Sequence, residues 1–323
     1  MLLLSPTFGS NALVRNYMKA IEPSVEIISF STYLGATRWG EEGPSNRVIT
    51  TAVKKKVFIG STQGRSPAID KLCELYGKLG TVLEVMKSPM EAESRNISLY
   101  VHPPLFMNEF SLGAVFGEEA VKKYVYKMFP EGPITQDLIR NMLAAWKEIM
   151  AILSLLHIPR INLLKFMTDD NYPVRPESLS RHDIDNFVQL EAIHQEYLVY
   201  VRYTSLLIDP FSEPDQHGRY FDFSAVPIRQ IFVDGEGYWD IPRMPKEDYY
   251  RTKIIQGIAK QLNVVCPTID KFIAAYERRL EKASLALQGQ KLSDAFVVQR
   301  FEEDLKMICT EIEKQKEPME ELR

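Results

Sequence analysis

The chain has 323 residues, of which 45% are hydrophobic and 25% are charged, values typical of a globular protein rather than a disordered one. Its 39 basic and 43 acidic residues give a net charge of −4, which argues against a surface for nucleic acid or anionic membranes. Three widely spaced cysteines without a Cys-x-x-Cys pair predict free thiols in a reducing compartment. No apolar run approaches the ~20 residues that span a bilayer and the N-terminus lacks a basic segment, so a cytoplasmic protein is expected.

The region over residues 1–94 has the alternating pattern of an α/β domain. The predicted elements, in chain order, are a buried strand (2–4), a turn (5–10), a helix (11–20), three strands (25–31, 48–51, 56–59), a helix (67–79) and a closing strand (82–86). This succession is typical of a doubly wound sheet.

A buried strand this close to the first residue needs neighbours on both sides, and a complete dinucleotide-binding domain begins with a glycine-rich strand–helix turn. The Gly-x-Gly sequence at Gly235-Glu236-Gly237 lies far downstream, between two short extended runs, and is predicted to be a hairpin tip. We therefore expect residues 1–94 to be the C-terminal half of a Rossmann-type domain, with the first βα units, about a hundred residues, absent from this chain.

From Pro103 onward the pattern becomes helical, and residues 95–323 are predicted to form a mainly α-helical catalytic domain. Tyr197, Tyr200 and Tyr203 share one face of a predicted helix and are expected to pack in its core. The helices predicted in this region are one opened by Pro133 and ended by Pro159, and others over 183–208, 248–262, 268–287 and 292–314, with extended pieces at 220–223 and 230–233.

His102 stands between an extended run and two prolines, Pro103 and Pro104. Because proline disfavours the α region in the residue before it and suits the first helical position, the prolines are expected to open a helix through Phe116. His102 would then lie at a helix N-terminus, where free N–H groups favour an anion. A titratable imidazole in such a place is a candidate general acid–base, although a histidine with no catalytic role is the commoner case.

A general acid–base histidine needs a partner that fixes its tautomer, and Asp248 is one candidate. Asp248 equally suits the first turn of a helix, where the helix dipole favours an acidic residue. Arg243, in a loop before that helix, suits a substrate carboxylate or a surface ion pair. The histidines and cysteines show no metal-ligand spacing, so no metal site is predicted.

Six stretches of uncommon residues carry a family resemblance: residues 5–10, 28–35, 98–108, 124–127, 129–135 and 220–227. In them the chain is similar to the opine dehydrogenases of the metallophore type, the staphylopine dehydrogenase-like family, and the resemblance covers essentially the whole chain.

The resemblance implies an NADPH-dependent reductive condensation, in which a nicotianamine-like amine attacks an α-keto acid and the imine is reduced to a secondary amine. The product is a metal-chelating opine. In the family, the histidine of the His-Pro motif works with an aspartate, and this histidine matches His102. More distant opine dehydrogenases carry Arg-x-x-x-x-Asp, which fits Arg243 for the substrate carboxylate and Asp248 for the histidine. Asn96 is assigned to the substrate side.

The chain departs from the family at two places. The dinucleotide motif is absent, so NADP(H) is expected to bind poorly, and only Thr7, Phe8 and Gly9 are expected to face the nicotinamide. Staphylopine-type members carry Asp after Thr-Tyr-Leu-Gly, where this chain has Ala36. Because a carboxylate there would repel the distal carboxylate of 2-oxoglutarate, alanine favours 2-oxoglutarate over pyruvate.

Two other interpretations stay open. The chain could be an inactive truncated fragment that acts only as a binding remnant. It could also be another oxidoreductase with a helical second domain, such as the 6-phosphogluconate dehydrogenase-like group, which the family-specific stretches disfavour. The expected partners are the small-molecule keto acid and amine, and neither nucleic acid nor a membrane is expected. A homodimer through the helical domain is a further possibility.

Overall fold

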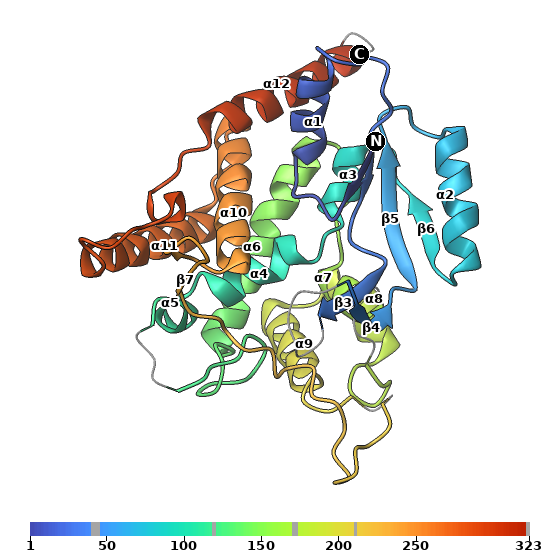
Figure 1. The fold of residues 1–323 in the computed structure, drawn as a ribbon. Coiled ribbons are helices and arrows are strands. Elements are labelled where there is room, and N and C mark those ends of the chain that lie inside the picture. Colours follow the sequence, from blue (N-terminus) through green and yellow to red (C-terminus); the bar gives the residue numbers. More distant parts are fainter. Residues whose placement is uncertain (40–45, 118–120, 170–173, 210–211, 321–323) are drawn as a thin grey trace. The chain divides into compact units, whose positions relative to one another are not determined.

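The computed structural model describes residues 1–39, 46–117, 121–169, 174–209 and 212–320 (Figure 1), without the side chains at 36–39, 49, 51–52 and 315–320. The chain divides into two compact units. The first is built mainly from residues 1–97 and 303–320, and the second from 98–168 and 174–302. The predicted division after residue 94 lies close to the first crossing, but the return of the C-terminal segment to the first unit was not predicted.

A four-stranded sheet with the order β1-β2-β5-β6 organises the first unit. β1 and β2 run parallel, as do β5 and β6, whereas β2 and β5 run antiparallel, so the sheet is mixed. The strand bounds are β1 Leu2–Leu4, β2 Ile28–Phe30, β5 Lys56–Ser61 and β6 Val82–Val85. The predicted α/β class is confirmed.

β1 lies at an edge of this sheet in the described chain, where the sequence predicted a buried strand. Leu2 and Leu4 are about half exposed and Leu3 is partly buried. Because successive side chains of a strand alternate between faces, Leu2 and Leu4 share the more exposed face. In the described chain, these two leucines are therefore more exposed than the predicted buried strand implies.

Helices of the first unit pack beside this sheet, and the core includes Phe30, Ile59 and Ile69. α2 (Pro67–Lys78) begins as predicted, because Pro67 occupies its first turn and the Ser66 hydroxyl accepts the Ile69 N–H at 3.2 Å. The other helices are α1 (Ser10–Met18), α3 (Pro89–Ser94) and α12 (Glu302–Glu320).

The segment predicted as a strand over 48–51 pairs elsewhere than expected. It belongs to β4 (Val48–Val53), which forms a separate antiparallel hairpin with β3 (Gly35–Trp39). The sequence of β3, Gly-Ala-Thr-Arg-Trp, has no apolar alternation, so β3 was not predicted.

The second unit is mainly helical, as predicted. Its long helix α6 begins after Thr135, whose hydroxyl accepts the Leu138 N–H at 3.2 Å, and not at Pro133. The bounds are α4 Ser98–Phe106, α5 Glu109–Val115, α6 Gln136–Leu155, α7 Leu163–Asp169, α8 Arg181–Asn186, α9 Ala192–Thr204, α10 Arg243–Gln261 and α11 Pro267–Ala286, with 3-10 turns at Phe187–Gln189 and Asp294–Phe296. β7 (Phe232–Val233) and β8 (Trp239–Asp240) pair antiparallel, so the Gly235–Gly237 sequence is the predicted hairpin tip.

The helix predicted over 183–208 is broken into α8 and α9. Tyr203 is buried as expected, but Tyr197 is 63% exposed and Tyr200 is 40% exposed, so the prediction of a shared core face was wrong for both. All three tyrosines lie in α9, where a step of three residues falls short of a full turn by about 60°, so Tyr197 and Tyr203 point about 120° apart. The face that α9 buries contains Leu198, Val199 and Tyr203.

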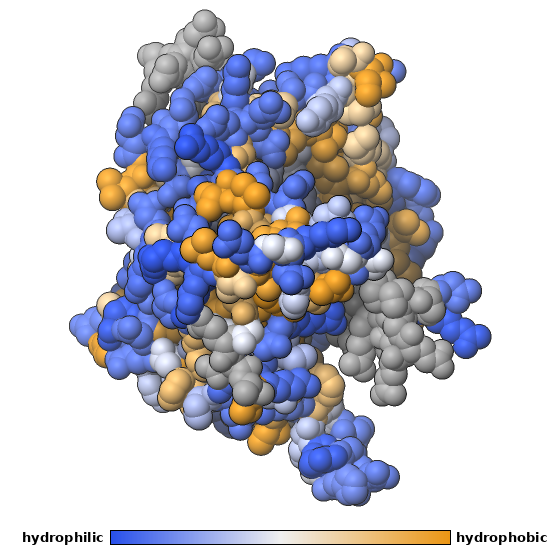
Figure 2. All heavy atoms as spheres, turned by 60° about the vertical axis from the view of Figure 1, so that its left-hand side comes forward, coloured by the Kyte–Doolittle hydropathy of each residue, from blue (hydrophilic) through white to orange (hydrophobic). Residues whose placement is uncertain are grey.

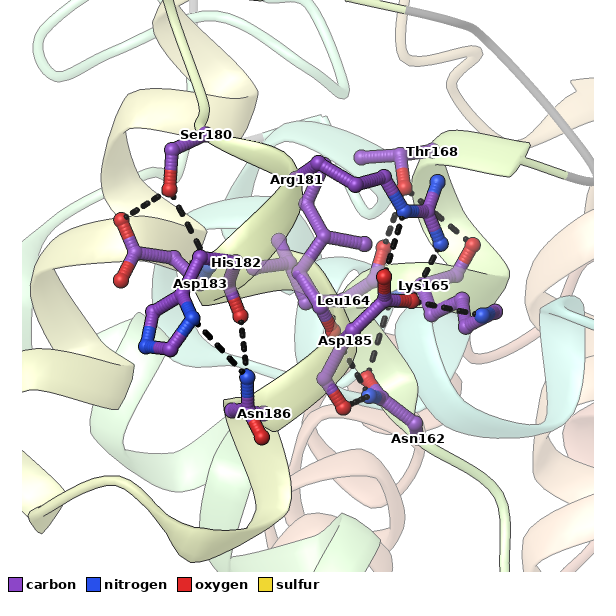
Figure 3. A network of polar contacts seen from close by, with 11 residues as sticks. Asn162, Leu164, Lys165, Thr168, Ser180, Arg181, His182, Asp183, Asp185 and Asn186 are labelled. Carbon is purple, nitrogen blue, oxygen red and sulfur yellow. Dashed lines mark hydrogen bonds and ion pairs between the residues drawn. The ribbon is translucent and has the colours of Figure 1, made fainter.

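Side chains at the end of α8 account for this break (Figure 3). The Asn186 amide donates to the His182 carbonyl at 2.9 Å, a local bond that competes with helix continuation. The Asn162 amide donates to the Ile184 carbonyl at 2.8 Å and ties the same end to the start of α7. A residue pattern alone does not reveal such side-chain caps at helix interiors.

Hydrophilic residues predominate on the face in Figure 2, with several separate apolar groups among them. Large exposed apolar side chains include Val265 and Leu285. Among the described residues, no helix has the length and apolar character needed to cross a membrane.

Candidate active site

His102 lies within α4 rather than at a helix N-terminus. α4 begins at Ser98 and contains Pro103 and Pro104, so the prediction that the prolines open the helix was wrong. The prolines lie beyond the first turn of α4 and have no N–H, so each of them removes one backbone hydrogen bond of this helix. The helix-dipole argument for an anion beside His102 therefore does not hold, and its surroundings must be judged from its contacts.

The side chain of His102 meets the carboxylate of Asp248, which α10 contributes. The imidazole Nδ1 lies 3.4 Å from Asp248 Oδ1, and the Phe106 ring packs against the imidazole with its edge at 5.5 Å between centroids. The His102 side chain is 16% exposed, whereas the Asp248 side chain is fully buried. A carboxylate on Nδ1 favours the tautomer that leaves Nε2 to exchange a proton with a substrate.

Asp248 does not lie in a first helical turn, because α10 already begins at Arg243. It points into the unit from the buried face of α10, beside Arg251, which is one turn further along. The Arg251 guanidinium donates to Asp248 Oδ1, the same oxygen that faces His102. Asp248 Oδ2 is buried and has no hydrogen-bond partner among the described residues. The site is thus a histidine–aspartate pair with an arginine behind it.

Arg251 was missed by sequence reasoning, although its spacing of three residues from Asp248 on a helix was a usable signal. We expect Arg251→Met to lower the free energy of unfolding by about 3 kcal/mol, because it leaves a buried carboxylate without its guanidinium. Urea unfolding followed by circular dichroism measures this change.

Arg243→Met is the matched control, since it makes the same substitution on the same helix. Arg243 is 75% exposed and pairs with Glu247 at 2.9 Å, a surface ion pair that contributes at most ~1 kcal/mol. Equal destabilisation by the two substitutions would contradict the compensating role of Arg251.

Arg243 and Asp248 both lie on α10, but the Arg243 side chain is exposed and the Asp248 side chain is buried. The Arg243 guanidinium contacts both Glu247 oxygens, at 2.9 and 3.2 Å, and this contact matches the ion-pair interpretation. To hold a substrate carboxylate, Arg243 would have to exchange this partner.

The predicted cofactor residues lie in the loop between β1 and α1. The Thr7 hydroxyl is buried and has no hydrogen-bond partner among the described residues. Phe8 is buried, and the Gly9 N–H donates to Glu93 Oε2 at 2.9 Å. A buried hydroxyl without a partner suits the carboxamide of a nicotinamide, so Thr7 fits this group, while Phe8 and Gly9 contribute mainly to the shape of the loop.

Glu93 was not singled out from the sequence, because nothing in the pattern of α3 distinguishes it from a surface residue. It is fully buried and accepts hydrogen bonds from Gly9, Asn11 and Ser29. Burial raises the pKa of the Glu93 carboxyl to about 7, and the hydrogen bonds oppose this shift because they favour the ionised form.

The remaining predicted substrate residues lie in the first unit. Asn96 is buried, and its amide donates to the Pro6 carbonyl at 3.5 Å, next to the loop of Thr7. The backbone of Ala36 lies in β3, opposite Ala52 of β4, but its side chain lies outside the described residues.

Comparison with known proteins identifies the family of this chain. The family model described as staphylopine dehydrogenase matches residues 1–312. The chain belongs to the staphylopine dehydrogenase family. It therefore belongs among the opine dehydrogenases, oxidoreductases that act on CH–NH bonds with a nicotinamide cofactor.

Three similar proteins illustrate this membership. Staphylopine synthase of Staphylococcus aureus is 51% identical over 97% of this chain and 72% of its own length. Pseudopaline synthase of Pseudomonas aeruginosa is 38% identical over 87% of this chain and 65% of its own length. A solved structure titled yersinopine dehydrogenase with bound NADP+ has a TM-score of 0.88 at 29% identity, over 97% of this chain and 72% of that one. The chain thus spans about two thirds to three quarters of these relatives.

Octopine dehydrogenase structures are more distant. One in complex with NADH and agmatine has a TM-score of 0.53 at 17% identity, a likeness that supports the fold alone.

Proposed function

We propose that this protein is an NADPH-dependent opine dehydrogenase that condenses an α-keto acid with a nicotianamine-like amine. The observation that carries the proposal is the contact between His102 Nδ1 and the buried carboxylate of Asp248 at 3.4 Å, within a chain of this family. The staphylopine, pseudopaline and yersinopine synthases among its relatives support the product class.

In this reaction the amine adds to the keto carbon and water leaves. The resulting iminium, which keeps one proton on its nitrogen, is reduced by hydride to a secondary amine, so the net reaction takes up one proton from solvent. A nicotinamide cofactor, when bound, would supply the hydride. His102 takes the proton that the attacking amine loses and returns it, through Nε2, to the hydroxyl that leaves as water. Asp248 holds the tautomer that this exchange requires, and Arg251 balances its buried charge.

The keto acid is proposed to be 2-oxoglutarate rather than pyruvate, and the product is then similar to pseudopaline or bacillopaline. Ala36 supports this choice, because a neutral residue there does not repel the second carboxylate of 2-oxoglutarate. Thr7, Phe8 and Gly9 are proposed to lie on the nicotinamide side, and Asn96 and Arg243 on the substrate side.

Steady-state kinetics of NADPH oxidation tests this proposal in the native enzyme. With a nicotianamine-like amine, we expect a higher kcat/KM for 2-oxoglutarate than for pyruvate. A higher kcat/KM for pyruvate would overturn the choice of keto acid, and no oxidation with either keto acid would overturn the activity itself.

A further inference from the structure

Glu93 is a buried carboxylate surrounded by hydrogen-bond donors. Its Oε1 accepts the Asn11 N–H at 2.8 Å and the Ser29 hydroxyl at 2.8 Å. Its Oε2 accepts the Gly9 N–H at 2.9 Å and the Asn11 side-chain amide at 2.9 Å. Among the described residues no cation pairs with it, so its contacts in the structure are hydrogen bonds.

Three of these four donors belong to the start of α1. Gly9 is the N-cap of this helix, and no side chain of its own segment caps it. Glu93 reaches the orphan N–H groups from α3, a different element, and places its charge at the positive end of the helix dipole. Ser, Thr, Asn or Asp usually makes such a cap locally.

The same carboxylate thereby sets the course of the loop between β1 and α1. Gly9 has a φ of 91°, a left-handed conformation, and its Cα faces Ile308 of α12, which leaves 2.8 Å for an added Cβ. Thr7, two residues earlier, has its hydroxyl buried without a partner in the described part of the chain. The direction of that hydroxyl depends on how the following backbone is held.

We propose that Glu93 is a positioning residue, which fixes the loop from Thr7 to Asn11 and thereby aims the Thr7 hydroxyl at the nicotinamide. This inference rests on the proposed placement of Thr7 on the nicotinamide side. In this role Glu93 acts through the loop, because both of its carboxylate oxygens already accept hydrogen bonds from Gly9, Asn11 and Ser29. Burial raises the pKa of the Glu93 carboxyl to about 7, although the surrounding hydrogen-bond donors favour its ionised form. The donors are therefore needed to keep the carboxyl ionised.

Glu93→Gln is the sharpest test, because glutamine has the same shape but carries an NH2 group in place of one oxygen. In either amide orientation the NH2 group faces a backbone N–H that can only donate, that of Asn11 or that of Gly9, so at least one of the four bonds is lost and two donors are brought together. Glu91→Gln is the matched control, since Glu91 is also buried on α3 but contacts the Lys87 N–H and the Arg95 guanidinium rather than the loop.

Three measurements on the native enzyme separate an effect on the loop from an effect on cofactor binding. Hydrogen–deuterium exchange of peptides covering residues 5–14, without cofactor, reports on the loop. Fluorescence titration with NADPH reports its Kd, and steady-state kinetics gives separate KM values for NADPH and the keto acid. For Glu93→Gln we expect faster exchange, an NADPH Kd raised about ten-fold or more, and a KM for the keto acid changed less than the KM for NADPH. Glu91→Gln should leave the exchange and the NADPH Kd near those of the wild type.

The outcomes distinguish this inference from the proposed function. Exchange and NADPH Kd as in the wild type would overturn the role of Glu93. Faster exchange in Glu93→Gln with an unchanged NADPH Kd would show that the loop does not contribute to cofactor binding. That result would overturn the proposed role of Thr7, even in an enzyme that is still active. If Glu91→Gln changes the exchange and the NADPH Kd as much as Glu93→Gln does, then Glu93 contributes only to general stability, and its positioning role is overturned. If the wild-type enzyme has no turnover with either keto acid, the proposed activity is wrong. The exchange data would still decide whether Glu93 holds the loop.

Discussion

Replacement of His102 by alanine is expected to lower kcat by about 10²- to 10⁴-fold, the usual contribution of a positioned general acid–base. The expected loss follows from the pairing of Nδ1 with the buried Asp248, which leaves Nε2 as the ring atom that can exchange protons with the substrate. NADPH oxidation under saturating amine and keto acid measures this change. The KM for NADPH should change little, because His102 is assigned to proton transfer and not to the cofactor.

His182→Ala serves as the control for His102→Ala. His182 is exposed on α8, and its ring Nδ1 lies 3.3 Å from the Asn186 amide in the network of Figure 3. This variant should keep wild-type turnover. Circular dichroism and thermal unfolding of His102→Ala should remain near those of the wild type. A His102→Ala enzyme with turnover close to the wild-type value would remove His102 from the mechanism.

The second large effect is expected at residue 36. Ala36→Asp should lower kcat/KM for 2-oxoglutarate and change the preference toward pyruvate. At an effective dielectric constant of ~20, two charges about 4 Å apart repel by about 4 kcal/mol, and even half of that is more than a ten-fold effect on kcat/KM. The ratio of kcat/KM for the two keto acids measures the change, since that ratio cancels any general loss of activity.

Ala36→Asn is the matched control for charge, because asparagine has nearly the shape of aspartate without its negative charge. It should reduce kcat/KM for both keto acids to a similar extent and leave their ratio nearer to the wild-type value. If the asparagine and aspartate variants have the same ratio, size rather than charge governs the choice of keto acid at this position.

The sequence predicted those elements that are determined by residues next to one another in the chain. The start of α2 followed from Ser66 and Pro67, and the hairpin tip followed from two glycines between extended runs. The pairing of 48–51 with β3 did not follow, because β3 has no apolar alternation that marks it as a strand. The break between α8 and α9 did not follow, because part of its cause is a contact from outside both helices. Asn162, for example, stabilises the end of α8 from more than twenty positions away.

Only some residues of the candidate site were predicted, because the site brings together residues that are far apart in the sequence. His102 and Asp248 were proposed together through a family resemblance, since 146 positions separate them and no spacing rule connects them. Arg251 could have been found from helical periodicity once Asp248 was placed on α10. Glu93 could not, because its function depends on three donors from α1 and one from β2 that only the folded chain assembles.

The discontinuous first unit has a consequence for synthesis on the ribosome. Arg15 of α1 pairs with Glu311 of α12, 296 positions later, and Ile308 of α12 lies against Gly9. The loop after β1 and the start of α1 therefore gain these contacts only once α12 has been translated. Residues 98–302 are translated before α12, so the described parts of the helical unit can contact one another before the first unit gains α12.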